Sequence, residues 1–158
     1  MLDDAARRVV ARELEELDEL LTSSTELLAT PTDANPPFER LAALSTVLTS
    51  FYTGLERIFG RIVAQLDAGQ PEGERWHIEL LNQVAHPAPE RPALISEASR
   101  ARLREYLAFR HRSRHAYAHR LVWAGMAQLV AGLPELWSAV RAEVLQFVQE
   151  PSPPDEGA

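Results

Sequence analysis

The chain of 158 residues has the length of one domain, and its 46% hydrophobic residues are enough to form a sizeable core. It contains no cysteine, which excludes disulfide bonds and thiolate metal sites and fits a reducing cytoplasm. No apolar run approaches the roughly 20 residues of a membrane span, and the N-terminus begins with aspartates where a secretory leader would have basic and then apolar residues. We therefore expect a soluble, cytoplasmic protein that does not contact a membrane.

The formal net charge of −7 is unevenly distributed along the chain. Residues 100–120 contain seven arginines and one acid, a local balance of +6 that leaves −13 on the remainder. Such asymmetry is typical of a localised anion site on an otherwise acidic surface. A solvated, arginine-rich helix face is the alternative, and the charge pattern alone leaves both open.

The first half of the chain predicts three helices separated by proline-rich breaks. Leucine and valine recur at helical spacing over residues 3–29, with acids on the other face. Prolines within residues 30–37 end this element, because proline lacks the N–H that a helix interior needs. The helix expected over 38–68 has an apolar stripe wide enough for two neighbours, which indicates the central helix of a bundle. A short helix over 75–85 precedes another proline-rich loop at 86–92.

The second half predicts two more helices. Ser96 is a plausible N-cap followed by an acid in the first turn, and the helix is expected to continue through the basic segment to about Ala131. Gly132 and Pro134 should interrupt it, with proline at the start of a last helix over 134–149. Strand signals and repeats are absent. The sequence therefore predicts an all-α, up-and-down bundle of four to five helices.

Three segments follow from this pattern. Residues 1–30 form an acidic amphipathic helix that is expected to pack on the bundle, residues 38–149 form the main helical domain, and residues 150–158 are expected to be a disordered tail.

Histidines are concentrated in the basic segment. Residues on an uninterrupted helix advance by about 100° each, so His111, His115 and His119 would form a ladder on one side. Two histidines four residues apart can share a zinc ion, but the chain lacks an HExxH pattern and cysteine. We therefore expect no metal site. A metal-binding bundle remains an alternative, as does a ladder of polar or partly packed histidines without a function.

Arg110 and His115 together carry the chemistry of metal-independent RNA cleavage. Histidine exchanges protons near neutral pH, and the planar fork of arginine binds phosphate oxygens in pairs. On a straight helix, however, five residues place these side chains about 140° apart. A helix break near Ser113, the reach of Arg110, or a second subunit would each solve the problem, and we expect a break together with a dimer.

The motif Arg110-x4-His115-x-Tyr117 resembles the R-x4-H-x-Y motif of the HEPN superfamily, in particular that of HepT-like ribonuclease toxins. The resemblance covers roughly residues 40–148. Other segments that carry it are Phe51-Tyr52, Gly54, Glu56-Arg57-Ile58, Trp76-His77, Arg91-Pro92 and Phe109-Arg110-His111.

This resemblance implies a HEPN-like helical bundle that forms a homodimer around a shared cleft. It implies a metal-independent endoribonuclease that leaves a 2′,3′-cyclic phosphate and needs no cofactor, with Arg110 and His115 as the catalytic pair. His111 and Glu56 are candidate supporting groups, although an ion pair with an arginine of a neighbouring helix is the simpler role for Glu56. The arginines that we expect to contact RNA phosphates are Arg104, Arg112 and Arg114.

The resemblance also implies a partner. HepT-like toxins are commonly encoded beside a minimal nucleotidyltransferase antitoxin that transfers AMP from ATP onto the motif tyrosine, here Tyr117. The added phosphate and base would compete with RNA for the cations of the site. A packed tyrosine with its hydroxyl at the surface is the alternative for Tyr117, and we expect Trp76 and His77 to be structural. The alternative function is a non-catalytic, substrate-binding partner of a nucleotidyltransferase, but the intact Arg110 and His115 pair favours an enzyme.

Overall fold

The computed structural model describes residues 1–149, and within them it contains six α-helices and no β-strand. The helices are α1 (Asp4–Ser23), α2 (Thr25–Leu28), α3 (Phe38–Leu66), α4 (Trp76–Val84), α5 (Glu97–Arg114) and α6 (Ala127–Gln149). Two short 3-10 turns, η1 (Ala118–Arg120) and η2 (Trp123–Gly125), lie between α5 and α6. The all-α prediction is confirmed, whereas the expected disordered tail at 150–158 lies outside the described residues.

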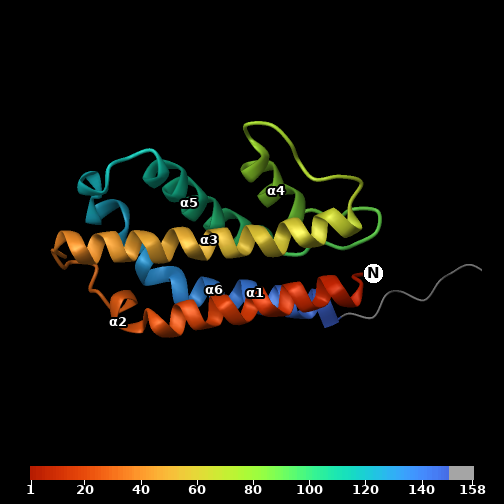
Figure 1. Ribbon diagram of the computed structural model, residues 1–158, viewed down its shortest axis with the longest axis horizontal. Coiled ribbons are helices and arrows are strands. Elements are labelled where there is room, and N and C mark those ends of the chain that lie inside the picture. The colour runs from red at the N-terminus through yellow and green to blue at the C-terminus, as the bar shows by residue number, and fades with distance from the viewer. Residues whose placement is uncertain (150–158) are drawn as a thin grey trace, which may run out of the picture.

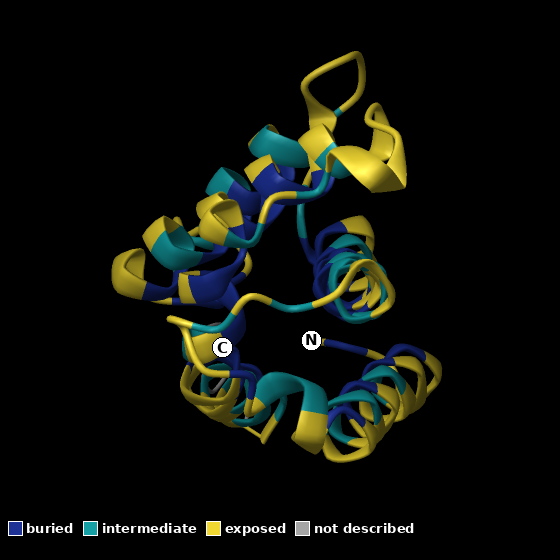
Figure 2. Ribbon diagram, turned by 90° about the vertical axis from the view of Figure 1, so that its left-hand side faces the viewer, coloured by how far each residue is buried: buried dark blue, intermediate teal, exposed yellow. Residues whose placement is uncertain are grey.

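Helix α3 is the centre of the fold. Helices α1 and α6 lie along one side of it, and α4 and α5 cover the other side (Figure 1). The long helices α1, α3, α5 and α6 alternate in direction, which gives the up-and-down topology. Because α3 has neighbours on both sides, apolar residues around much of its circumference are fully buried, including Phe51, Ile58 and Val63. Figure 2 shows the buried segments facing the interior between the helices.

The N-terminal helix packs closely against the centre. At Gly54 of α3 a Cβ atom would lie 2.7 Å from Cδ2 of Leu17, so the missing side chain is what lets α1 approach. Asp18 of α1 then joins α6, since it accepts hydrogen bonds from Trp137 Nε1 at 2.8 Å and from Arg141 Nε at 2.9 Å. Helix α1 is therefore part of the same packed core as α6 and α3.

Two helix boundaries differ from the prediction in the outer layers. The first helix is not continuous over 3–29, because α1 ends at Ser23 and the separate turn α2 follows the buried Ser24. The last helix does not begin at Pro134; it begins at Ala127 and contains the proline in its interior. An internal proline costs about 3 kcal/mol, but each large apolar side chain that this helix buries contributes about 1.5–3 kcal/mol. The buried side chains on both sides of the proline are Leu129, Val130, Leu133, Leu136, Trp137, Val140 and Val144.

Helix α5 begins where expected but ends much earlier. The Ser96 side chain accepts a hydrogen bond from the backbone N–H of Ser99 at 3.2 Å, which confirms the N-cap. The predicted continuation to Ala131 is wrong, because the helix ends at Arg114. Residues 115–120 are all exposed, so a longer helix would have had no apolar face to bury there. The cationic last turn also suits a helix C-terminus, where the backbone dipole attracts positive charge.

A buried ion pair fixes the loops that flank α4. The Arg91 guanidinium donates to both carboxylate oxygens of Asp67, at 2.6 and 2.7 Å, and to the carbonyl oxygens of Gln83 and His86. Both charged side chains are almost completely buried. This network ties the end of α3 to the loop after α4, and it therefore sets where α4 lies against the bundle.

Candidate active site

One buried carboxylate joins the three helices on this side of the bundle. Glu56 of α3 accepts a hydrogen bond from Nη1 of Arg110 in α5 through Oε1, at 2.5 Å. Its other oxygen, Oε2, lies 2.5 Å from Nδ1 of His77 in α4. The same carboxylate thus contacts a side chain from α5 and a side chain from α4. The sequence leaves two roles open for Glu56, support of the site and an ion pair with an arginine of a neighbouring helix. The two coincide, because the arginine that pairs with Glu56 is Arg110 of the motif.

Arg110 is held in a fixed orientation. Its side chain is 8% exposed, and its Cζ atom lies 5.5 Å from the centre of the Tyr52 ring, within the range of a cation–π contact. Burial raises the pKa of the Tyr52 hydroxyl well above its ordinary value. Within residues 1–149, the bond to Glu56 is the only hydrogen bond from the Arg110 guanidinium, a group with five N–H donors. Most of these donors remain available to an anion.

The end of α5 brings His115 to the same cavity as Arg110. His115 is the C-cap residue, with φ −106° and ψ 0°, and its backbone N–H donates to the carbonyl of Arg112 at 3.3 Å. The helix thus ends just after Ser113, where the spacing of the motif required a break. A cavity of 560 Å³ is lined by both Arg110 and His115, so a single chain supplies both residues to one cavity.

The other predicted cationic residues lie at the same cavity. His111 is exposed, and its ring lies edge-on to that of His115 with 5.0 Å between the ring centres. The exposed arginines that line the cavity with them are Arg104, Arg112 and Arg114. The segment before α4 adds Glu74 and Arg75 to the lining. The lining is therefore strongly cationic, and Glu74 contributes its carboxylate.

The predicted ladder of three histidines is wrong. Because α5 ends at Arg114, His119 lies in η1, where its ring stacks on that of Tyr117 with 5.6 Å between the ring centres. Only His111 and His115 remain neighbours. Nowhere in residues 1–149 are three or more possible metal-binding side chains grouped to hold an ion.

Tyr117 is the exposed tyrosine of the motif. It lies two residues beyond His115, at the start of η1, and is 78% exposed. The packed alternative considered for this tyrosine does not describe its ring, which lies at the surface against His119. Its hydroxyl is thus accessible to a large partner.

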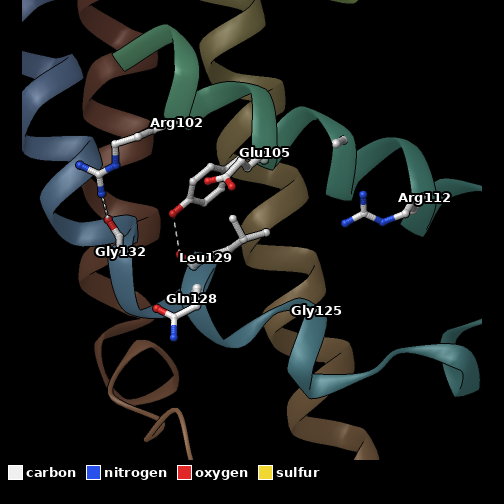
Figure 3. Close-up of a pocket in the computed structure, with 9 residues that line it drawn as sticks. Arg102, Glu105, Arg112, Gly125, Gln128, Leu129 and Gly132 are labelled. Carbon is white, nitrogen blue, oxygen red and sulfur yellow. Dashed lines mark hydrogen bonds between the residues drawn. The ribbon is translucent and has the colours of Figure 1, made fainter. Parts of the chain in front are cut away.

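A second cavity, of 310 Å³, lies between α5 and α6 (Figure 3). Arg102 donates to the carbonyl oxygen of Gly132 at 3.1 Å, and Tyr106 donates to that of Leu129 at 2.6 Å. These groups bind backbone atoms of α6 and hold the two helices together. The crevice is accordingly a packing feature, although Arg112 lies at the edge of both cavities.

His77 lies at the cavity although the sequence interpretation did not place it there. We expected it to be structural, and it does contact the buried Glu56, but it also lines the same cavity as Arg110 and His115. Its ring packs on the neighbouring Trp76 ring, with 3.6 Å between the ring centres. A separation of 21 residues from Glu56 carries no periodic signal, and only the position of α4 on α3 brings the two together.

Fold and site together define a helical bundle in which an arginine and a histidine from the end of one helix meet at a cationic cavity. The family model described as HepT-like protein matches residues 43–150, which include most of α3 and all of α4, α5 and α6. This is more than half of the chain, and the protein belongs to the HepT-like family. No curated protein and no solved structure gives a significant match. Within residues 1–149, no helix is both long and apolar enough to cross a bilayer.

Proposed function

We propose that this HepT-like protein is the toxin of a toxin–antitoxin pair and acts as a metal-independent endoribonuclease. The observation that carries the proposal is the meeting of Arg110 and His115 at one cavity, with Arg110 fixed by the buried carboxylate of Glu56. Membership of the HepT-like family supports the same class of activity.

The geometry suits attack of a ribose 2′-hydroxyl on the adjacent phosphate. The Arg110 guanidinium would bind the phosphate oxygens, whose negative charge grows in the transition state. His115 would transfer a proton, because imidazole can both accept and donate one near neutral pH. Arg104, Arg112 and Arg114 would hold the neighbouring phosphates without reading the base sequence. The products would be a 2′,3′-cyclic phosphate and a free 5′-hydroxyl.

The first experiment is cleavage of total RNA by the purified protein in excess EDTA. We expect the wild type to cut, and His115→Ala to lose the activity while it keeps its melting temperature, since this side chain is exposed. His86→Ala is a matched control, because His86 is also exposed and its ring, which bonds to the carbonyl of Asn82 on α4, lies outside the lining of this cavity. Full activity in His115→Ala would contradict the assignment.

We also propose that the protein works as a homodimer. Ile78 and Ala108 are at least partly exposed among the charged side chains that line the cavity, and a second copy packed beside the cavity would cover them. Light scattering should give the mass of a dimer. Since Arg110 and His115 of one chain line one cavity, a mixed dimer of Arg110→Met and His115→Ala subunits should be inactive. Activity regained by the mixture would show that each site takes its arginine and histidine from different subunits.

Tyr117 is the proposed site of control by a minimal nucleotidyltransferase antitoxin. Its ring is 78% exposed and lies beside a cationic cavity, so an attached AMP would place a phosphate where RNA binds. Tyr117→Phe should still cut RNA but resist inactivation by the antitoxin and ATP, whereas the buried control Tyr106→Phe should be inactivated like the wild type. Inactivation of Tyr117→Phe would exclude this acceptor.

A wild type that cuts nothing would favour the second function class, a non-catalytic partner of the nucleotidyltransferase with the basic segment as a docking surface. Mass spectrometry must first show that Tyr117 does not already carry AMP.

A further inference from the structure

The cavity contains a second histidine on a different helix from His115. His77 is 27% exposed, and its Nδ1 atom is occupied by the bond to Oε2 of Glu56. The Trp76 ring packs against one face of the imidazole, so the orientation of the ring is fixed from two directions. The sequence motif does not include this residue, and the proposed mechanism above does not use it.

The environment of His77 determines which ring nitrogen carries a proton. Glu56 forms an ion pair with the Arg110 guanidinium, and a carboxylate in an ion pair has no proton to donate to its other neighbour. Nδ1 of His77 must therefore donate to Glu56, and in the neutral ring this leaves the lone pair on Nε2. A carboxylate behind the ring also stabilises the imidazolium that forms when Nε2 accepts a proton.

We propose that His77 is the general base of this site and that His115 is the general acid, an inference that rests on the proposed ribonuclease function. Nε2 of His77 accepts the proton of the attacking 2′-hydroxyl as the bond between the 2′-oxygen and phosphorus forms. The bond between phosphorus and the 5′-oxygen breaks, and the protonated ring of His115 donates its proton to that leaving oxygen. One proton is taken up and one is released, so the step balances without an oxidant, a reductant or a further reactant.

Two histidines on separate helices solve a problem that one histidine cannot. Attack and departure take place on opposite sides of the phosphorus atom, and a single ring cannot lie on both sides at once. His77 on α4 and His115 at the end of α5 line one cavity, and Arg110 lies in the lining of the same cavity. The arrangement therefore supplies a base, an acid and a fixed cation from a single chain.

The proposal predicts a bell-shaped dependence of kcat/KM on pH, because His77 must be neutral and His115 protonated. On the acidic side of this curve, kcat/KM falls because protonated His77 can no longer act as the base. Glu56 from α3 contacts His77 directly. The other charged and titratable groups that line the cavity with His77 are Glu74 and Arg75 before α4, and Arg104, Arg110, His111, Arg112, Arg114 and His115 from α5 and its C-cap.

The decisive variant is His77→Asn. The asparagine amide can still donate to Glu56 as Nδ1–H does, but it has no group that accepts a proton. We expect kcat to fall by about 10²- to 10⁴-fold, the usual contribution of general acid–base catalysis, and we expect the acidic limb to disappear while the melting temperature is kept. His86→Asn is the matched control and should keep the wild-type profile. Wild-type kcat in His77→Asn would overturn the proposal and leave His77 only the positioning of Glu56.

An RNA substrate with sulfur in place of the bridging 5′-oxygen separates the two roles, because a thiolate leaves without a proton donor. This substrate should restore the rate of His115→Ala and leave that of His77→Asn low. The reverse result would overturn the assignment of base and acid. If His77→Asn fails to fold, His77→Gly with added imidazole takes its place: restored cleavage supports the role, and none contradicts it. Wild type without cleavage would instead refute the ribonuclease function itself.

Discussion

The buried pair of Glu56 and Arg110 gives the sharpest prediction about stability. Both side chains are less than a tenth exposed and lie 2.5 Å apart. Removing one partner of such a pair leaves an uncompensated charge in the interior, which costs about 3–5 kcal/mol. We therefore expect Glu56→Ala to lower the free energy of unfolding by about this amount, because the guanidinium of Arg110 has no other hydrogen-bonding partner within residues 1–149.

The reverse substitution should cost less. In Arg110→Met, Glu56 keeps its bond to His77, so the carboxylate is not left without a donor. The double variant, Glu56→Ala with Arg110→Met, removes both charges and should recover part of the loss, with a coupling energy of about 1–3 kcal/mol. Arg110→Met should also abolish RNA cleavage, because the phosphate loses its fixed cation.

Urea unfolding followed by circular dichroism measures these four free energies, with the m value as a check that the transition stays two-state. If Glu56→Ala costs less than about 1 kcal/mol, the pair behaves like an exposed ion pair. Arg110 would then not be held rigidly by Glu56, and the reasoning about a preorganised site would be refuted.

Three other predictions concern the core. Tyr52→Phe should be neutral or slightly stabilising, because the buried hydroxyl finds no hydrogen-bond partner among residues 1–149. Tyr106→Phe should cost about 1 kcal/mol, because it loses a bond to a carbonyl of α6, and urea unfolding compares the two variants. Burial raises the pKa of Tyr106 from 10.0 to about 12, so this group favours the native state below pH 10 and its contribution is lost between pH 10 and 12. The free energy of unfolding of Tyr106→Phe should accordingly fall less steeply than that of the wild type between pH 10 and 12. The same pH dependence in both proteins would contradict this reasoning. Gly54→Ala should cost about 1–3 kcal/mol by pressing on Leu17, and a melting temperature equal to the wild type would show that α1 can move away.

Most helices could be predicted from the sequence because the features that start, end and bury a helix lie within it or next to it. The apolar stripe of α3, the prolines before it and the N-cap at Ser96 each act within a few residues. The end of α5 could not be predicted this way, since no glycine or proline lies between Arg110 and Gly125. The helix ends there because the next residues have nothing to pack against, which is a property of the whole fold. Pro134 shows the opposite case, in which tertiary packing keeps a helix intact that its local sequence would interrupt.

The motif residues could be chosen from the sequence, but their surroundings could not. Arg110 and His115 are close in the chain, and their types indicate phosphate chemistry. The side chains that fix Arg110, Glu56 and Tyr52, come from α3, and His77 comes from α4. All three residues lie far from the motif in the sequence. Only the three-dimensional packing of α3, α4 and α5 shows that one carboxylate serves both Arg110 and His77.

The early end of α5 links the proposed catalysis to the proposed control. If the helix continued, His115 would turn away from Arg110, and Tyr117 would lie on yet another face of the same cylinder. Because it stops at Arg114, His115 reaches the cavity, and the chain then turns outward to expose Tyr117. The same helix end thus places His115, the proposed proton donor, in the lining of the cavity and an exposed tyrosine two residues beyond it. On the proposed function, a single AMP attached to Tyr117 would compete with RNA for the arginines beside it.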